Sequence, residues 1–88
     1  MEFTATIRVR PKTEVRDPQG ESVAGALRAL GFEVADVRTG KEIIVRFSAP
    51  DERAAGEAAR TMGDQLLANP VIEDYEVSLG GPVGTPGR

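Results

Sequence analysis

The sequence predicts an α+β domain, a small antiparallel sheet with two helices on one face in the order β-α-β(β)-α-β. Residues 3–9, near the start, and residues 74–79, near the end, alternate apolar and polar side chains with the period of a strand that buries one face. Between them, two segments repeat apolar residues at helical spacing. At 88 residues this is a single domain over 1–79, followed by a Gly/Pro-rich tail, 80–88, that we expect to be disordered.

The first strand is predicted by strict alternation over residues 3–9, and Pro11 ends it or marks a sheet edge. Its outer face carries Arg8 and Arg10, which suit an anion site or a solvated face, and we favour the solvated face. The expected inner face consists of Phe3, Ala5, Ile7 and Val9.

The first helix has signals at both ends. Asp17 is the expected N-cap, Pro18 fits the first helical position, and Gly31 fits the C′ position with Phe32 as its apolar contact. The loop before the helix lacks the glycine spacing of a phosphate loop, so Asp17 is interpreted as a cap rather than a ligand residue. The apolar stripe is Val23, Leu27 and Leu30.

The middle of the chain leaves two interpretations open. Val34 and Val37 start a strand pattern, Thr39-Gly40-Lys41 supplies a turn, and residues 42–47 alternate again, so residues 34–48 form a hairpin or one bent strand. Ile44 falls on the face opposite its apolar neighbours. An apolar residue there indicates that the second face of the sheet is partly covered, for example by another subunit, although a single exposed isoleucine is also ordinary.

The second helix begins near Ala49-Pro50-Asp51, and Asn69-Pro70 stops it abruptly before the last strand. Its glycines, Gly56 and Gly63, weaken it by up to about 1 kcal/mol each relative to alanine. The expected apolar stripe is alanine-rich and consists of Ala55, Ala58, Ala59, Met62 and Leu66.

Composition excludes several classes of site. There is no Cys and no His, which removes thiolate chemistry, the usual general base and the commonest metal ligand. The formal net charge is −3 with scattered basic residues, which disfavours nucleic-acid binding. No signal peptide or membrane-spanning run is visible, so a cytoplasmic protein is expected.

The acidic residues near the last strand do not form a convincing catalytic pair. Glu73 and Asp74 are adjacent and point to opposite faces of a strand, whereas Asp74 and Glu76 share a face without an evident cleft. We therefore expect no catalytic, cofactor-binding or metal-binding residue in this chain, and we interpret the acidic run as a solvated or partner-facing edge.

Four segments in register resemble the PurS family, the small subunit of phosphoribosylformylglycinamidine synthase. The resemblance covers about residues 3–79 and is most specific in the last segment. The segments are Asp17-Pro18-Gln19-Gly20; Ala26-Leu27 through Leu30-Gly31-Phe32; Val37-Arg38-Thr39-Gly40-Lys41; and Leu66-Leu67-Ala68-Asn69-Pro70-Val71-Ile72-Glu73-Asp74-Tyr75.

The resemblance implies a place in de novo purine biosynthesis. Such a complex is a ligase that makes formylglycinamidine ribonucleotide from formylglycinamide ribonucleotide, ATP and glutamine. A glutaminase subunit (PurQ-like) releases ammonia, and a larger synthetase subunit (PurL-like) binds ATP and magnesium. The PurS-like chain carries no catalytic residue; it bridges the two, supports ammonia transfer, and associates through its sheet into a dimer or a dimer of dimers.

The sequence offers candidate interface residues for both kinds of contact. The free strand edges and the second sheet face, with Ile44, are expected to mediate self-association, whereas Arg38, Lys41 and the loop 17–20 are expected to contact the larger subunit. The competing interpretations are an ACT-like module that senses an amino acid between paired subunits, and a free-standing enzyme. The full set of candidates is Asp17, Gln19, Gly20, Arg38, Lys41, Ile44, Asn69 and Tyr75.

Overall fold

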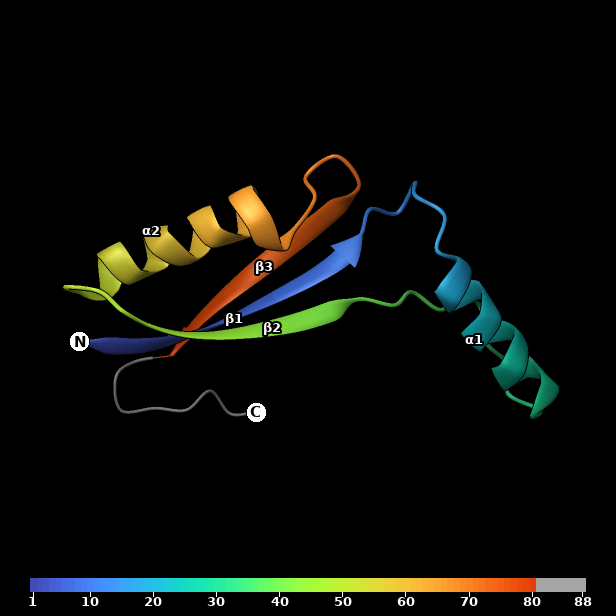
Figure 1. The fold of residues 1–88 in the computed structure, drawn as a ribbon. Helices are drawn as coiled ribbons and strands as arrows, with labels where there is room; N and C mark the ends of the chain where they lie inside the picture. The colour runs from blue at the N-terminus through green and yellow to red at the C-terminus, as the bar shows by residue number, and fades with distance from the viewer. Residues whose placement is uncertain (81–88) are drawn as a thin grey trace.

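The computed structural model describes residues 1–80, which form an α+β fold in the order β-α-β-α-β (Figure 1). One three-stranded antiparallel sheet has the strand order β2-β1-β3, so the first strand lies in the centre and both neighbours are edge strands. The elements are β1 (Glu2–Pro11), α1 (Pro18–Ala29), β2 (Lys41–Ser48), α2 (Glu52–Met62), the π-helix η1 (Gly63–Leu67) and β3 (Glu73–Gly80).

The core lies between one face of the sheet and α2. The predicted inner face of β1 is confirmed, since Phe3, Ala5, Ile7 and Val9 are all buried. In the register, Ile7 faces Ile43 of β2 and Val77 of β3, so a row of β-branched residues crosses the sheet under the helix. Small side chains, Ala55 and Ala59, form the buried side of α2 and allow it to lie close to the strands.

The opposite, open face of the sheet is a ladder of charges. Arg8 Nε lies 3.2 Å from Glu42 Oε2, Arg10 Nη2 lies 3.2 Å from Glu76 Oε2, and Lys12 Nζ lies 2.8 Å from Asp74 Oδ1. These pairs link the central strand and the residue after it to both edges. The side chains of the two arginine pairs are about half exposed, so each of these pairs contributes little to stability. The open face is thus mainly polar.

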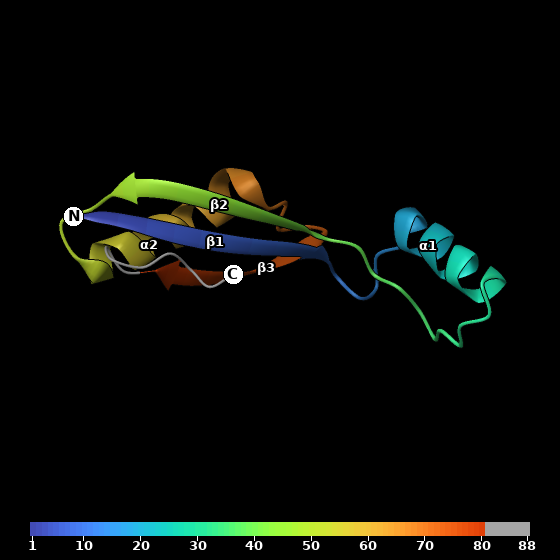
Figure 2. The same cartoon turned by 90° about the horizontal axis from the view of Figure 1, so that it is seen from below.

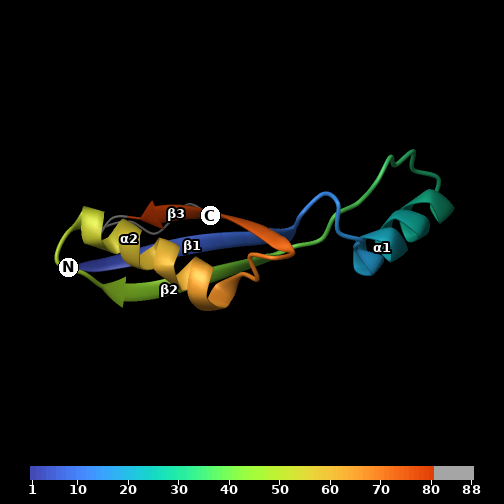
Figure 3. The same ribbon diagram turned by 90° about the horizontal axis from the view of Figure 1, so that it is seen from above.

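The two helices do not share a face of the sheet, and that part of the predicted fold is wrong. Only α2 packs on the strands, whereas α1 lies beyond the end of the sheet (Figures 2 and 3). The described chain is correspondingly elongated, with principal extents of 50 × 28 × 14 Å. The apolar stripe of α1 consequently has no sheet to cover, and Leu30, at the end of that helix, is 74% exposed.

The local signals of α1 are nevertheless confirmed. Asp17 caps the helix, Pro18 occupies its first position, and Gly31 has φ 101°. The amide of Phe32 donates to the Leu27 carbonyl over 3.1 Å, and the amide of Gly31 donates to the Arg28 carbonyl over 3.0 Å. These two bonds form a Schellman motif, as the glycine predicts.

The strand expected from Val34 and Val37 is absent, and neither a hairpin nor a bent strand forms. Residues 33–40 are irregular, and a single strand begins at Lys41. The reason is that α1 has carried this segment beyond the sheet, where no strand lies beside it. Its carbonyls are bound instead by Arg28, whose Nε donates to Val34 and whose Nη2 donates to Ala35, at 3.0 and 2.9 Å.

A π-helical turn changes which leucine faces the core. The Ala68 amide donates to the Gly63 carbonyl, a bond five residues apart, over 3.0 Å. The wider turn delays the phase of the helix, so Leu67 packs against the core whereas Leu66 is 82% exposed. The predicted stripe is therefore correct up to Met62 and wrong at Leu66.

Within residues 1–80, no helix is both long and apolar enough to cross a bilayer. Gly80 ends β3, and the remainder of the expected disordered tail, 81–88, lies outside the described residues.

Replacing Gly63 by alanine should destabilise the fold. An added Cβ would come within 2.6 Å of the Tyr75 ring, and relief of this overlap costs about 1–3 kcal/mol. Gly56→Ala, in the same helix, is the matched control, because its nearest neighbours are the Arg60 guanidinium nitrogens at 3.7 Å or more. Urea unfolding should give a lower midpoint for Gly63→Ala and an unchanged or higher midpoint for Gly56→Ala. Equal midpoints would contradict the close approach.

Candidate functional site

The first of two clusters that contain the candidate residues is the joint, which we define as Asp17, Gly20, Arg38 and Thr39. It connects α1 to the start of β2. Asp17 is 7% exposed, and its carboxylate accepts bonds from the Gly20 amide (3.0 Å) and from the Thr39 amide (2.7 Å). The Thr39 hydroxyl adds a contact of 3.1 Å. One carboxylate thus caps the helix and ties it to a segment 22 residues away in sequence.

Two further features fix the joint. A Cβ on Gly20 would lie 2.2 Å from the Val37 carbonyl oxygen, so only glycine permits the helix to approach this segment so closely. Arg38 Nη2 donates to the carbonyls of Lys12 and Val15, both over 2.7 Å. The guanidinium therefore closes the loop that leads from β1 into the helix.

The second cluster is the corner, which we define as residues 68–75, where the chain turns from η1 into β3. Asn69 accepts the Val71 amide on its side chain (3.1 Å), and its backbone carbonyl accepts the amides of Ile72 and Glu73 at 3.1 and 2.7 Å. The Glu73 carboxylate completes the loop by accepting the Asn69 amide over 2.7 Å. Asn69 therefore organises a turn, as its residue type predicts.

Tyr75 ties the corner to the helix above it. Its hydroxyl donates to Asp64 Oδ1 over 2.8 Å and lies 3.1 Å from the Arg60 carbonyl oxygen, while its ring rests on Gly63. The hydrogen bond to Asp64 raises the pKa of Tyr75 above its ordinary value. Tyr75 is thus a structural contact between β3 and the C-terminal end of the helix.

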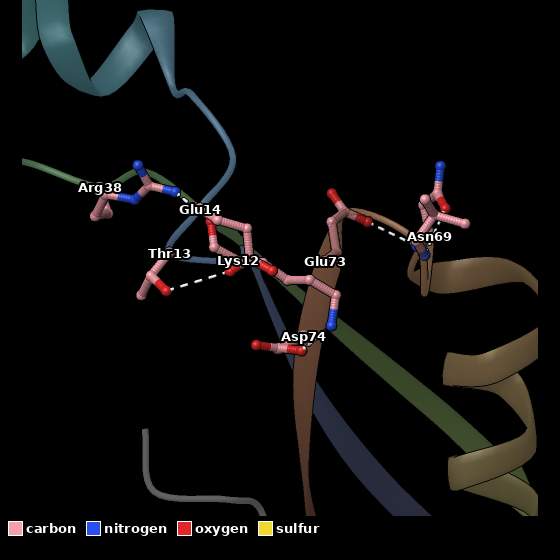
Figure 4. Close-up of polar contacts among 8 residues, drawn as sticks. Lys12, Thr13, Glu14, Arg38, Asn69, Glu73 and Asp74 are labelled. Carbon is pink, nitrogen blue, oxygen red and sulfur yellow. Dashed lines mark hydrogen bonds and ion pairs between the residues drawn. The ribbon is translucent and has the colours of Figure 1, made fainter.

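Lys12, which is not among the candidate residues, connects the two clusters (Figure 4). Its carbonyl accepts from Arg38 in the joint, its amide donates to the Ile72 carbonyl over 2.9 Å, and its ammonium pairs with Asp74. The bond to Asp74 raises the pKa of Lys12 above its ordinary value. A lone lysine after a strand gives no sequence signal for such a role.

The remaining candidate residues lie apart from these clusters. Gln19 is exposed in the first turn of α1, and Lys41 is exposed at the start of β2. Lys41 borders a surface depression of about 430 Å³ that also contains Arg8, Arg10 and Arg38, so this depression is mainly cationic. Ile44 is 59% exposed on the open face.

A groove with apolar walls lies on the other face of the sheet, between β2 and the end of the helix. Its volume is about 430 Å³, and Met62 and Leu66 form one wall opposite Val45. We call this the β2 groove. Its lining is Val45, Thr61, Met62, Gln65, Leu66 and Leu67. In the described residues, no group of three or more acidic side chains is arranged to hold a metal ion.

The stability of the joint should depend on pH through Asp17. Bonds from the backbone amides of Thr39 and Gly20 hold the pKa of Asp17 below its ordinary value of 3.8. A lowered folded pKa means that the contribution of Asp17 is complete above 3.8 and is lost as the pH falls through the folded value. Asp17→Asn should therefore accelerate amide exchange in α1 at neutral pH, and this difference from wild type should vanish in acid.

Asp51→Asn is the control, because Asp51 caps α2 through the Ala54 amide alone (2.8 Å) and ties no distant segment. Its effect should be confined to α2. Unchanged α1 exchange in Asp17→Asn at neutral pH would contradict the assigned role of the joint.

Comparison with known proteins gives one consistent result. A family model described as PurS, phosphoribosylformylglycinamidine (FGAM) synthase, matches residues 4–81. A PurS subunit from Synechocystis is 47% identical over 74 residues, which cover 83% of this chain and 74% of the relative. The sequence-based family resemblance is thereby confirmed.

Solved structures agree. PurS from Thermus thermophilus superposes with a TM-score of 0.83 at 40% identity, and the match covers 92% of this chain and 98% of the other. A chain in the structure of PurLQS from Thermotoga maritima gives a TM-score of 0.83 at 36% identity over 90% and 98% of the two chains. This chain therefore belongs to the PurS family and is a subunit of phosphoribosylformylglycinamidine synthase, an enzyme of purine biosynthesis.

Proposed function

We propose that this chain is a non-catalytic bridging subunit that joins the glutaminase and synthetase subunits of the synthase and supports ammonia transfer between them in the cytoplasm. In this proposal the synthetase subunit holds ATP and magnesium. The relationship to a chain of PurLQS from Thermotoga maritima supports an assembly with PurL-like and PurQ-like partners.

The observation that carries the proposal is the distribution of polar and apolar groups. The candidate polar side chains Asp17, Arg38 and Tyr75 are engaged in bonds that hold the fold together. Several large apolar side chains, in contrast, face solvent on α1, in the β2 groove and at the corner. Such a surface suits protein contacts rather than proton transfer or bond cleavage.

Self-association follows from the incomplete cover of the sheet. α2 packs mainly on β1 and β3, which leaves the β2 groove open. In the same chain, α1 exposes an apolar stripe that the joint holds away from the sheet. The molecule thus contains an unfilled apolar groove and an unpartnered apolar helix, and the joint keeps the two apart.

A second copy of the chain would fill the β2 groove and cover the apolar stripe of α1 at the same time. In the arrangement we propose, α1 of each copy lies in the β2 groove of the other, which gives a two-fold interface. Fully burying an exposed valine or leucine contributes up to about 1.5–3 kcal/mol, so Val23 and Leu30 from two helices give a substantial favourable term, to which partly exposed Leu27 adds less. This proposal places the dimer contact on the α2 side of the sheet, and not on the free strand edges and second sheet face that the sequence led us to expect.

Ile44 lies on the open face and stays a candidate for a different contact. It is the large apolar residue among the charged pairs of that face, so it suits the joining of two dimers rather than the formation of one. In light scattering, Ile44→Glu should lower the mass of a tetramer to that of a dimer, and it should not dissociate the dimer into single chains.

Leu30→Glu should lower the oligomer mass. Leu30 is exposed in the single chain, so its replacement leaves the fold of the subunit intact but places a charge in the proposed interface. Ala29→Glu is the matched control, since it adds the same charge to the same helix end on a different face. Light scattering should give a reduced mass for Leu30→Glu and an unchanged mass for Ala29→Glu. Equal masses for the two variants would contradict the proposed position of α1 in the interface.

The bridging role is tested by reconstitution with purified glutaminase and synthetase subunits. Product formation from glutamine should require this chain. Product formation from added ammonia should not, because the synthetase then needs no ammonia from the glutaminase. Lys41→Glu should raise the concentration of this chain that is needed for the full glutamine-dependent rate, since Lys41 borders the cationic depression expected to face the synthetase. A glutamine-dependent rate that is the same without this chain would contradict the proposal, as would turnover by the chain alone.

A further inference from the structure

The corner contains side chains that the fold does not use. Ala68 packs in the core, and Asn69 and Glu73 hold the turn by hydrogen bonds. Between them, Val71 is 78% exposed and Ile72 is 42% exposed, although both are large and apolar. We call Pro70, Val71 and Ile72 the apolar tip.

The backbone of the apolar tip is held on both sides. The amide of Val71 is bound by the Asn69 side chain, the amide of Ile72 by the Asn69 carbonyl, and the Ile72 carbonyl by the amide of Lys12, just after β1. Pro70 further restricts the chain because its ring fixes one dihedral angle. A loop that is already ordered loses little conformational entropy when it binds, so its exposed side chains contribute more of their burial to affinity.

The charge around the tip indicates what binds it. The same end of the molecule carries the carboxylates of Asp64 and Glu73, and neither forms an ion pair among the described residues. Pairing of two tips from identical copies would bring these carboxylates together, which is unfavourable. A partner surface with basic side chains around an apolar pocket would complement both the apolar tip and the carboxylates beside it.

We propose that the apolar tip inserts into an apolar pocket, bordered by Lys or Arg side chains, on a non-identical partner subunit of the synthase. This inference rests on the proposed bridging function and assigns one of its contacts to three residues of the corner. It separates the surfaces by partner: α1 and the β2 groove contact a second copy, and the apolar tip contacts another protein.

The test compares Val71→Asp with Val71→Leu in the full chain. Titration calorimetry against the separately purified glutaminase and synthetase should show at least tenfold weaker binding to one of them for Val71→Asp. Val71→Leu should bind as wild type does, because the side chain stays apolar. Ser22→Asp, which adds the same charge to α1 and away from the tip, should also bind as wild type does. The thermal unfolding midpoint and oligomer mass of Val71→Asp should equal those of wild type, since Val71 is exposed.

The possible failures are distinguishable. If wild type binds a partner and Val71→Asp binds it equally well, the inference is wrong and the bridging function stands. If the oligomer mass of Val71→Asp falls, the tip belongs to the contact between copies, and the inference is also wrong. If wild type binds neither subunit, alone or mixed, the bridging function is overturned together with the inference.

Discussion

The carboxylate of Asp17 is the contact on which the arrangement of this chain depends. It joins the first turn of α1 to Thr39 just before β2, and Gly20 allows the two segments to touch. Because this joint holds α1 beyond the end of the sheet, one helix is left to cover three strands. The β2 groove, the exposed stripe of α1 and the elongated outline all follow from that single constraint.

This arrangement gives a physical reason for a subunit that works by contact. A chain of 88 residues has a marginal core even when all of its elements pack together, and here one element is withdrawn from the core. The open face tolerates water because its charges are paired across the strands. The apolar surfaces that remain lie at separate places on the molecule, so more than one protein can be bound at once.

Much of the local structure was predictable from the sequence because local chemistry determines it. Alternation identified β1 and β3, Asp17 and Gly31 identified the ends of α1, and Asn69 identified the turn at the corner. The family resemblance rested on the same short segments. The structure adds an internal role for Asp17, Gly20 and Arg38, which hold the joint, whereas their expected contact with another subunit stays a prediction.

The errors arose where distant contacts decide the outcome. Val34 and Val37 are β-branched residues that suit a strand, but no strand lies beside this segment, and Arg28 binds its carbonyls instead. The apolar stripe of α1 suits a sheet that the joint keeps out of reach. Leu66 was assigned to the core by α-helical spacing, which the π-helical turn interrupts, and Lys12 gave no signal because its partners lie in other elements.

The position of α1 in solution is the most direct test of this account. The natural sequence has no cysteine, so spin labels on cysteines introduced at Ala29 and Ser48 report one defined distance. Labelled chain diluted into excess unlabelled chain restricts the measurement to pairs within one molecule. Double electron–electron resonance should give a narrow distribution at a separation comparable with the 50 Å long axis. A short or broad distribution, as expected for α1 folded back on its own sheet or moving freely, would contradict the account.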